Sequence, residues 1–112
     1  MTGGNLLAGI DPSAAEESFA ALLTLPGVEI ERIVSTGQAS PPGFWYDQPW
    51  AEWVVLIAGA SAVQFADEAE PRPLAVGDYL YIAPGRRHRV ARTDPGQPTV
   101  WLAVHIGKPA ET

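Results

Sequence analysis

Short apolar runs, separated by glycine and proline, make up most of this chain. Eleven glycines and eleven prolines punctuate its 112 residues. Runs of β-branched and aromatic residues bounded by such turn residues are typical of an all-β sandwich or barrel. We expect strands over 28–35, 44–47, 53–57, 60–65, 79–82, 87–92 and 99–106, with the third and fourth forming a hairpin around residues 58–59.

The segment before the first predicted strand carries a helical pattern instead. Asp11 or Ser13 can cap a helix, and Pro12 suits its first turn. Glu16 and Glu17 would favour its positive end. We therefore expect one short N-terminal helix, which ends at a Pro-Gly pair. Apolar residues at helical spacing would dock it on the barrel, namely Phe19, Leu22 and Leu23.

Length and composition predict one globular domain over residues 1–112. A chain of 112 residues has the size of one ordinary domain. Its apolar content of 46% and charged content of 18% are those of a folded protein rather than a disordered one. We expect the barrel core to span about 28–106, with flexible ends over 1–10 and 107–112.

Charge and hydropathy narrow the possible partners. The net charge of −6 argues against nucleic acid, since duplex binding depends on many basic contacts to phosphate. No segment approaches the ~20 apolar residues of a membrane span, and residues 1–5 lack the basic start of a secretory signal. We expect a cytoplasmic protein with no membrane partner. Because cysteine is absent, disulfides and thiolate metal sites are excluded.

Two segments place a side chain suited to metal or proton chemistry beside a predicted strand. Glu52 opens a strongly apolar run that ends at the turn residue Gly59. His88 follows a short amphipathic strand and a rigid corner at Pro84 and Gly85. Imidazole is the commonest protein metal ligand, and its unperturbed pKa lies close to physiological pH.

The second segment resembles the second motif of the cupin superfamily. Gly77, Gly85 and His88 fall on that motif. The proline stands one place late, at Pro84, and Arg92 occupies the place of the motif's asparagine. The resemblance identifies the chain as a small single-domain cupin. It implies a double-stranded β-helix, or jelly-roll barrel, which can hold a cavity between its sheets.

The first segment resembles half of the first cupin motif. Glu52 and Gly59 match it, but its two histidines are missing. Two spacings within the motif are allowed, and they differ by one residue. Such a slip exchanges the faces of every side chain in a strand, so both alternatives stay open. Asp47 is equally compatible with a turn in which it binds its own backbone. The missing histidines fall on Trp45 and Asp47, or on Tyr46 and Gln48.

The resemblance also implies a metal site. Glu52 and His88 among apolar neighbours would be costly to bury unpaired, and a divalent cation satisfies both. His105 shares a strand face with Trp101 and can complete a set of two histidines and a carboxylate. Such sets bind iron, zinc or manganese, and nickel is a further option. The candidate metal ligands are Glu52, His88, Asp47, Gln48 and His105.

Aromatic and basic side chains near these positions are candidates for ligand binding. Three of the four tryptophans lie near the first motif, and amphipathic rings form ligand-binding walls or protein interfaces. The cluster of arginines over 86–92 fits either a solvated strand face or an anion-binding rim, from which Arg86 or Arg92 could hold a carboxylate. The candidate substrate-binding residues are Tyr46, Trp45, Trp101 and Arg92.

Three functions remain open on these grounds. The first is a metal-binding cupin of unknown reaction that acts on a small polar organic substrate in the barrel cavity. The second is a metal-free module that binds or senses a small ligand, which the missing histidines favour directly. The third is a structural barrel that only dimerises, since homodimers are usual in the family. We favour the first for binding, without assigning a reaction.

Overall fold

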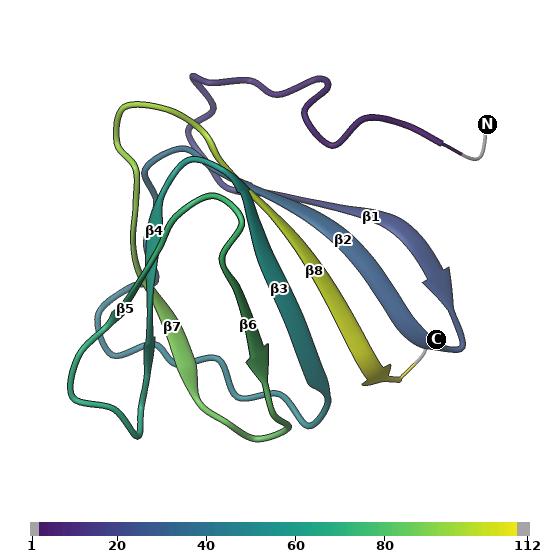
Figure 1. Ribbon diagram of the computed structural model, residues 1–112, viewed down its shortest axis with the longest axis vertical. Helices are drawn as coiled ribbons and strands as arrows, with labels where there is room; N and C mark the ends of the chain where they lie inside the picture. The colour runs from purple at the N-terminus through teal and green to yellow at the C-terminus, as the bar shows by residue number, and fades with distance from the viewer. Residues whose placement is uncertain (1–2, 110–112) are drawn as a thin grey trace.

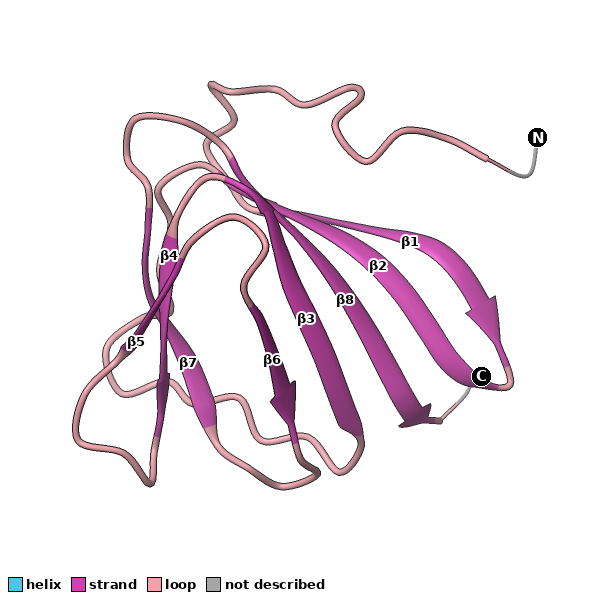
Figure 2. Ribbon diagram, viewed as in Figure 1, coloured by secondary structure: helices cyan, strands magenta, loops and turns pink. Residues whose placement is uncertain are grey.

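A computed structural model describes residues 3–109 as an all-β barrel (Figures 1 and 2). Each predicted strand except 44–47 is present, with ends that differ by a few residues, and two strands that were not predicted are added, the first and the short fifth. The strands are β1 (Ser18–Leu25), β2 (Gly27–Ser35), β3 (Ala51–Ala58), β4 (Ser61–Phe65), β5 (Arg72–Leu74), β6 (Tyr79–Ile82), β7 (His88–Thr93) and β8 (Thr99–Lys108).

The strands form two antiparallel sheets that face each other. One sheet has five strands in the order β1-β2-β8-β3-β6, and the other has three in the order β5-β4-β7. Alternate residues along each strand point between the sheets, as the buried positions 52, 54 and 56 of β3 show. The apolar core between the sheets consists of Val54, Leu56, Val63, Phe65, Leu74, Leu80, Ile82, Trp101 and Ala103.

The prediction of an N-terminal helix is wrong, because residues 3–109 contain no helix. The segment is the edge strand β1, paired with β2, and Gly27 makes the turn between them at a φ of 75°. A bulge between Ala21 and Leu23 breaks the alternation of β1. This bulge leaves the apolar residues at a spacing that resembles a helix. Asp11 accepts hydrogen bonds from the backbone and hydroxyl of Ser13, an Asx turn rather than a helix cap.

Residues 44–47 do not form the expected strand. Tyr46 alone makes a bridge, exchanging backbone hydrogen bonds of 2.7 and 3.1 Å with His88. The bridge fixes the loop before β3 against the start of β7, and so joins the two motif segments in space.

The two ends of the chain are described only in part. Strand β8 runs to Lys108, and the outermost parts of the predicted flexible ends, 1–2 and 110–112, lie outside the described residues. Over 3–109 no helix is long and apolar enough to cross a membrane. The cytoplasmic location stays a prediction.

Candidate functional site

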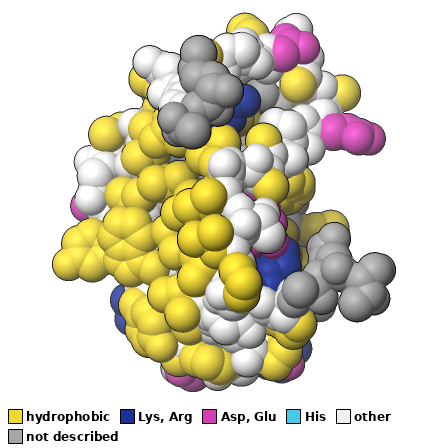
Figure 3. All heavy atoms as spheres, turned by 90° about the vertical axis from the view of Figure 1, so that its right-hand side faces the viewer, with side chains coloured by type: hydrophobic (Ala, Val, Ile, Leu, Met, Phe, Trp, Pro, Cys, Tyr) yellow, Lys and Arg dark blue, Asp and Glu magenta, His cyan; other side chains and the backbone are white. Residues whose placement is uncertain are grey.

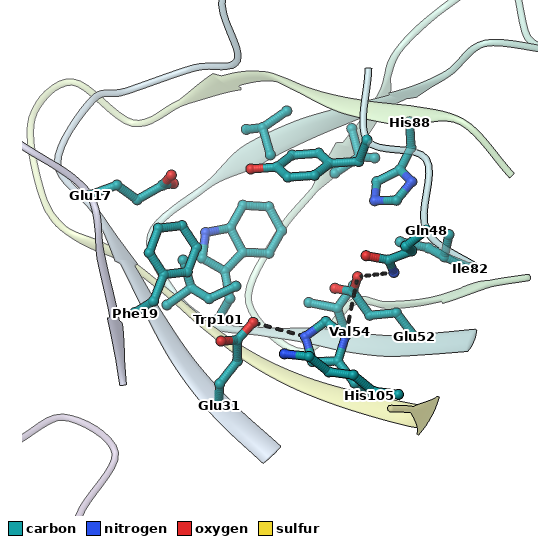
Figure 4. A pocket seen from close by; sticks show the side chains of 15 residues that line it. Glu17, Phe19, Glu31, Gln48, Glu52, Val54, Ile82, His88, Trp101 and His105 are labelled. Atoms are coloured by element: carbon teal, nitrogen blue, oxygen red, sulfur yellow. Dashed lines mark hydrogen bonds and ion pairs between the residues drawn. The ribbon is translucent and has the colours of Figure 1, made fainter. Parts of the chain in front are cut away.

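A pocket of about 190 Å³ lies between the two sheets. Its volume corresponds to roughly six water molecules in the liquid, enough for a small organic molecule. Strands from both sheets and the loop before β3 contribute to its wall (Figure 4). The polar lining residues are Glu17, Glu31, Tyr46, Gln48, Glu52, His88, His105 and Lys108, and the apolar ones are Phe19, Ile33, Val54, Val63, Ile82, Val90 and Trp101.

His88 presents one nitrogen of its ring to this pocket. Its Nδ1 lies 3.0 Å from the carbonyl oxygen of Arg86. A carbonyl only accepts, so Nδ1 carries the hydrogen and neutral His88 has its lone pair on Nε2. Nε2 has no hydrogen-bond partner among the described residues, although the residue is only 6% exposed. The Tyr46 ring stacks on the imidazole at 5.4 Å and helps to hold it. His88 therefore offers an acceptor, or a base, to whatever occupies the pocket.

Glu52 enters the pocket from β3 and is held by Gln48. The Gln48 side-chain amide donates to Oε1 of Glu52 at 2.8 Å. Glu52 is 8% exposed and pairs across the sheet with His105, whose Nδ1 lies 4.0 Å from the same oxygen. Because Gln48 donates to only one oxygen of Glu52, this carboxylate can also accept a hydrogen bond from a ligand.

Both ring nitrogens of His105 are already engaged. The Trp50 indole N–H donates to Nδ1 at 2.9 Å, and Nε2 donates to Glu31 at 2.8 Å. His105 in this arrangement is therefore the neutral tautomer with its hydrogen on Nε2. Its pKa is nevertheless raised above 6.5: burial lowers it, but the hydrogen bond to Glu31 and the charges of Glu52 and Glu31 outweigh that effect. Protonation would add a hydrogen to Nδ1, which breaks the bond from Trp50.

Three carboxylates surround the phenol of Tyr46. Burial raises the pKa of Tyr46 above 10, and the charges of Glu17, Glu52 and Glu31 raise it further. Tyr46 is therefore a neutral phenol at physiological pH. The same three glutamates all line this pocket, so its polar wall is rich in carboxylates.

Glu17 is tied to the pocket wall through a buried serine. Ser35 donates from its hydroxyl to Glu17 at 2.6 Å and accepts from the Trp101 indole N–H at 3.4 Å. Ser35 has no exposed surface. Hydrogen bonds therefore connect Trp101, an aromatic residue of the pocket lining, through Ser35 to Glu17, the residue just before β1.

The structure separates the candidates that the sequence left open. Tyr46 and Gln48 line the pocket, whereas Asp47, which lies between them, is exposed. Trp45 and Arg92 are not among the lining residues. Trp45 lies instead beside the guanidinium groups of Arg87 and Arg89, at 5.8 and 6.0 Å, and Arg92 is exposed. The lining residues Glu52, His88, His105 and Trp101 were all anticipated from the sequence.

The arginine cluster does not form an anion-binding rim on the pocket. Arg86 pairs with Asp67 at 3.1 Å and with Glu68 at 3.3 Å, and its guanidinium lies 3.6 Å from the centre of the Phe65 ring. Arg89 donates to the carbonyl oxygen of Ser40. None of the four arginines lines the pocket, so its negative charge is not offset from this side.

Sequence reasoning missed four polar residues of the site, namely Glu17, Glu31, Trp50 and Lys108. Glu31 shares a strand face with Ile33, and this alternation was the available signal. Glu17 was assigned to a helix that does not form. Trp50 reaches His105 across 55 residues of sequence, which no local pattern reveals.

The donor set of this pocket does not match a metal centre. Among residues 3–109, no group of three or more histidine, cysteine, aspartate or glutamate side chains is placed to hold a metal ion. Catalytic zinc sites use three such protein ligands. His105 has both nitrogens in other bonds, which leaves Glu52 and His88 with only an amide, Gln48, beside them.

Comparison with known proteins gives a family and a fold. Residues 32–105 match the family described as Cupin domain. A solved structure from Ralstonia eutropha JMP134, described as a putative mannose-6-phosphate isomerase, is 49% identical with a TM-score of 0.92, covering 95% of this chain and 98% of that chain.

More distant structures share the fold alone. A Thermus thermophilus protein is 17% identical with a TM-score of 0.78, covering 97% of this chain and 100% of its own. A polyketide cyclase from Streptomyces resistomycificus is 18% identical with a TM-score of 0.72, covering 90% of this chain and 72% of its own. No curated protein sequence matches the chain.

Proposed function

The chain belongs to the cupin family, and on that premise we propose that it binds a small organic molecule with the side chains of its barrel pocket. One observation carries the proposal. His88 is 6% exposed, yet its Nε2 faces the pocket without a partner among the described residues. This nitrogen is accessible from the pocket rather than sealed in the core, so a ligand with a hydrogen-bond donor can reach it.

The rest of the lining supports a ligand with a polar end and an apolar body. Glu52 holds one oxygen toward Gln48 and can accept from a ligand as well. Trp101, Ile33 and Val54 provide an apolar wall in the same pocket. Pockets of this kind, mostly apolar with a few converging polar groups, are the usual binding sites for small molecules.

The activity in the name of the Ralstonia eutropha protein is not proposed for this chain. Recognition of a phosphate group uses arginine, lysine or a helix N-terminus. The pocket is lined by three glutamates and one lysine, Lys108, and this lysine binds Glu29 at 2.6 Å. A sugar phosphate would be repelled more than it is held.

A divalent metal at His88 and Glu52 is the second candidate, and one observation favours it. The Nδ1–H of His88 donates to a backbone carbonyl, which is how metal-ligating imidazoles are commonly oriented. Zinc, iron, manganese or nickel would then need Gln48 or Tyr46 as a further ligand. The shortage of donors places this candidate after the organic ligand.

A thermal-shift panel of small amines, alcohols, sugars and carboxylates on chelator-treated protein tests the proposal. A ligand at a hundred times its Kd adds about 2.7 kcal/mol to stability, a shift of several degrees. We expect at least one class to raise Tm in the wild type and in Arg92→Ala, whose side chain lies outside the pocket. The shift should be lost in His88→Leu. A panel without any shift contradicts the proposal, as does a shift that survives His88→Leu. A shift that needs added metal supports the second candidate.

The homodimer expected from the family stays a proposal, and the structure supplies a surface for it. All eight residues of β1 are exposed, and it forms an edge of the five-stranded sheet. Figure 3 shows apolar side chains gathered on this side of the molecule. A long apolar edge strand left uncovered promotes association, and two copies can pair antiparallel across a two-fold axis. The exposed apolar residues of β1 are Phe19, Leu22, Leu23 and Leu25.

A further inference from the structure

The pocket is lined by more carboxylates than lysine or arginine side chains. Three glutamates line it, against one lysine that is held by Glu29. Hydrogen bonds to the glutamates come from neutral donors: the Ser35 hydroxyl to Glu17, and the Gln48 amide to Glu52. Glu31 accepts from His105, which is neutral while Trp50 donates to its Nδ1.

These three carboxylates surround one volume rather than lying on separate surfaces. Each of them raises the pKa of the half-buried phenol of Tyr46, and Figure 4 shows Glu31, Glu52 and Glu17 around the same opening. An anionic ligand would meet all three charges at short range in a partly desolvated site, where electrostatic interactions are stronger than in water. The pocket therefore selects against anions.

A second and independent feature gives the hydrogen-bonding character of the ligand. The unpartnered Nε2 of His88 is an acceptor, as are the carboxylate oxygens of Glu17, Glu31 and Glu52. Acceptors predominate on the polar wall, so a complementary ligand supplies donors. An alcohol supplies one O–H, whereas a primary ammonium supplies three N–H groups and a positive charge.

The apolar wall defines the rest of the molecule. Trp101 and Phe19 offer aromatic surface, and Ile33, Val54 and Val90 offer aliphatic surface. Aromatic faces also attract organic cations. At about 190 Å³, the pocket suits an amine with a ring or a short chain rather than a polyamine or a peptide.

We propose that the pocket binds a small primary organic amine as its ammonium ion, with the charged nitrogen among Glu17, Glu31, Glu52 and His88 and the apolar body against Trp101. This inference rests on the proposed function, that the pocket binds a small molecule, and adds the chemical class of that molecule.

Three probes of nearly equal shape but different charge show how the charge of a ligand affects its affinity. Benzylamine is a cation at neutral pH, benzyl alcohol is neutral and benzoate is an anion. Isothermal titration calorimetry on chelator-treated full-length protein gives their Kd values. We expect benzylamine to bind about 10-fold or more tightly than benzyl alcohol, since hydrogen bonds between charged partners are roughly twice as strong as neutral ones. Benzoate should not bind.

Matched variants test whether the preference for a cationic ligand comes from the glutamates of the pocket. Glu17→Gln and Glu31→Gln keep the side-chain shape, and each should weaken benzylamine about 10-fold while leaving benzyl alcohol nearly unchanged. Glu16→Gln removes the same charge from an exposed neighbour outside the pocket lining and should change neither probe by more than about twofold. His88→Leu removes an acceptor shared by both probes and should weaken both. Melting curves confirm that each variant is folded.

The possible outcomes distinguish the proposal of an ammonium ligand from the proposal that the pocket binds a small molecule. If benzyl alcohol binds as tightly as benzylamine and both are lost in His88→Leu, the ammonium proposal is overturned and the binding pocket stands. Benzoate binding, or an equal loss in Glu16→Gln and Glu17→Gln, also overturns it. If none of the three probes binds, the ammonium proposal is overturned, and the pocket is then judged by the wider thermal-shift panel. If binding ignores His88→Leu, both proposals fail.

Discussion

Replacing Glu31 with glutamine should lower the pKa of His105, because it removes a negative charge that favours the imidazolium. Nε2 of His105 donates to Glu31 at 2.8 Å, within a side-chain pair that is 8% and 15% exposed. The carboxylate favours the protonated imidazole through its charge, whereas the amide of glutamine keeps an acceptor but not the charge. The raised pKa of His105, which depends on Glu31 and Glu52 against the opposing effect of burial, should therefore fall.

The magnitude follows from the contact that changes. A hydrogen bond to a charged group contributes about 1.5–3 kcal/mol and a neutral one about 0.5–1.5, so the substitution removes roughly 1.5 kcal/mol of preference for the imidazolium. Glu52 at 4.0 Å remains, and this charge keeps the loss from being larger.

Proton NMR titration of the two histidine rings measures this pKa directly. His88→Leu assigns the resonances, since the chain has two histidines, and Glu16→Gln serves as the matched charge control. A His105 pKa that is unchanged or higher in Glu31→Gln would refute the reasoning. A fall of equal size in Glu16→Gln would show that the effect is one of net charge rather than of contact.

The same shift predicts a stability difference with a definite sign. Because the pKa of His105 is raised by folding, its contribution is full below the unfolded value of about 6.5 and is lost as pH rises through the folded value. The wild type should exceed Glu31→Gln in stability by more at about pH 5.5 than at about pH 8.5. Urea unfolding at the two pH values checks this, and an advantage that grows toward high pH would contradict it.

Three further predictions concern other contacts. Trp50→Phe removes the indole donor that favours neutral His105, so the pKa of His105 should rise in the same NMR titration. A fall would be inconsistent with the assigned tautomer. Gly59→Ala should cost about 2–4 kcal/mol in urea unfolding, because a β-carbon at 59 would lie 2.6 Å from Cα of Thr99 at a φ of 84°; a loss below about half a kcal/mol would argue against this close approach. Light scattering should find a dimer for the wild type and a folded monomer for Leu23→Lys, since Leu23 is 46% exposed on the edge strand; a monomeric wild type would remove the dimer.

The pattern of apolar and turn residues along the chain was sufficient to predict an all-β barrel and some of the residues that line its pocket. Six of the eight strands in residues 3–109 were found because apolar residues alternate between turn residues. Glu52 and His88 were found because each follows the spacing of a cupin motif, and both line the pocket. Such signals lie within a dozen residues of sequence, where a single chain carries enough information.

The remaining features depend on contacts between distant segments. Tyr46 and Gln48 rather than Trp45 and Asp47 face the pocket because Tyr46 bridges to His88, and a one-residue slip of this loop would reverse the choice. The helical interpretation of β1 failed because pairing with β2 and one bulge overrode the local pattern.

Glu31 was missed for a related reason. In the sheet register His105 lies opposite Glu29, yet its side chain bonds to Glu31, the diagonal neighbour two residues along. Diagonal contacts across strands depend on register and twist together. Neither is visible before the sheet is assembled.

The dependence of ligand binding on metal tests the central claim most directly. Benzylamine would be titrated calorimetrically into protein as purified, into the same protein after chelation, and into chelated protein reloaded with zinc. The account predicts one Kd in all three, because Glu17, Glu31, Glu52 and His88 bind the ligand themselves. Binding that disappears with chelation and returns with zinc would contradict it and would assign the pocket to a metal centre.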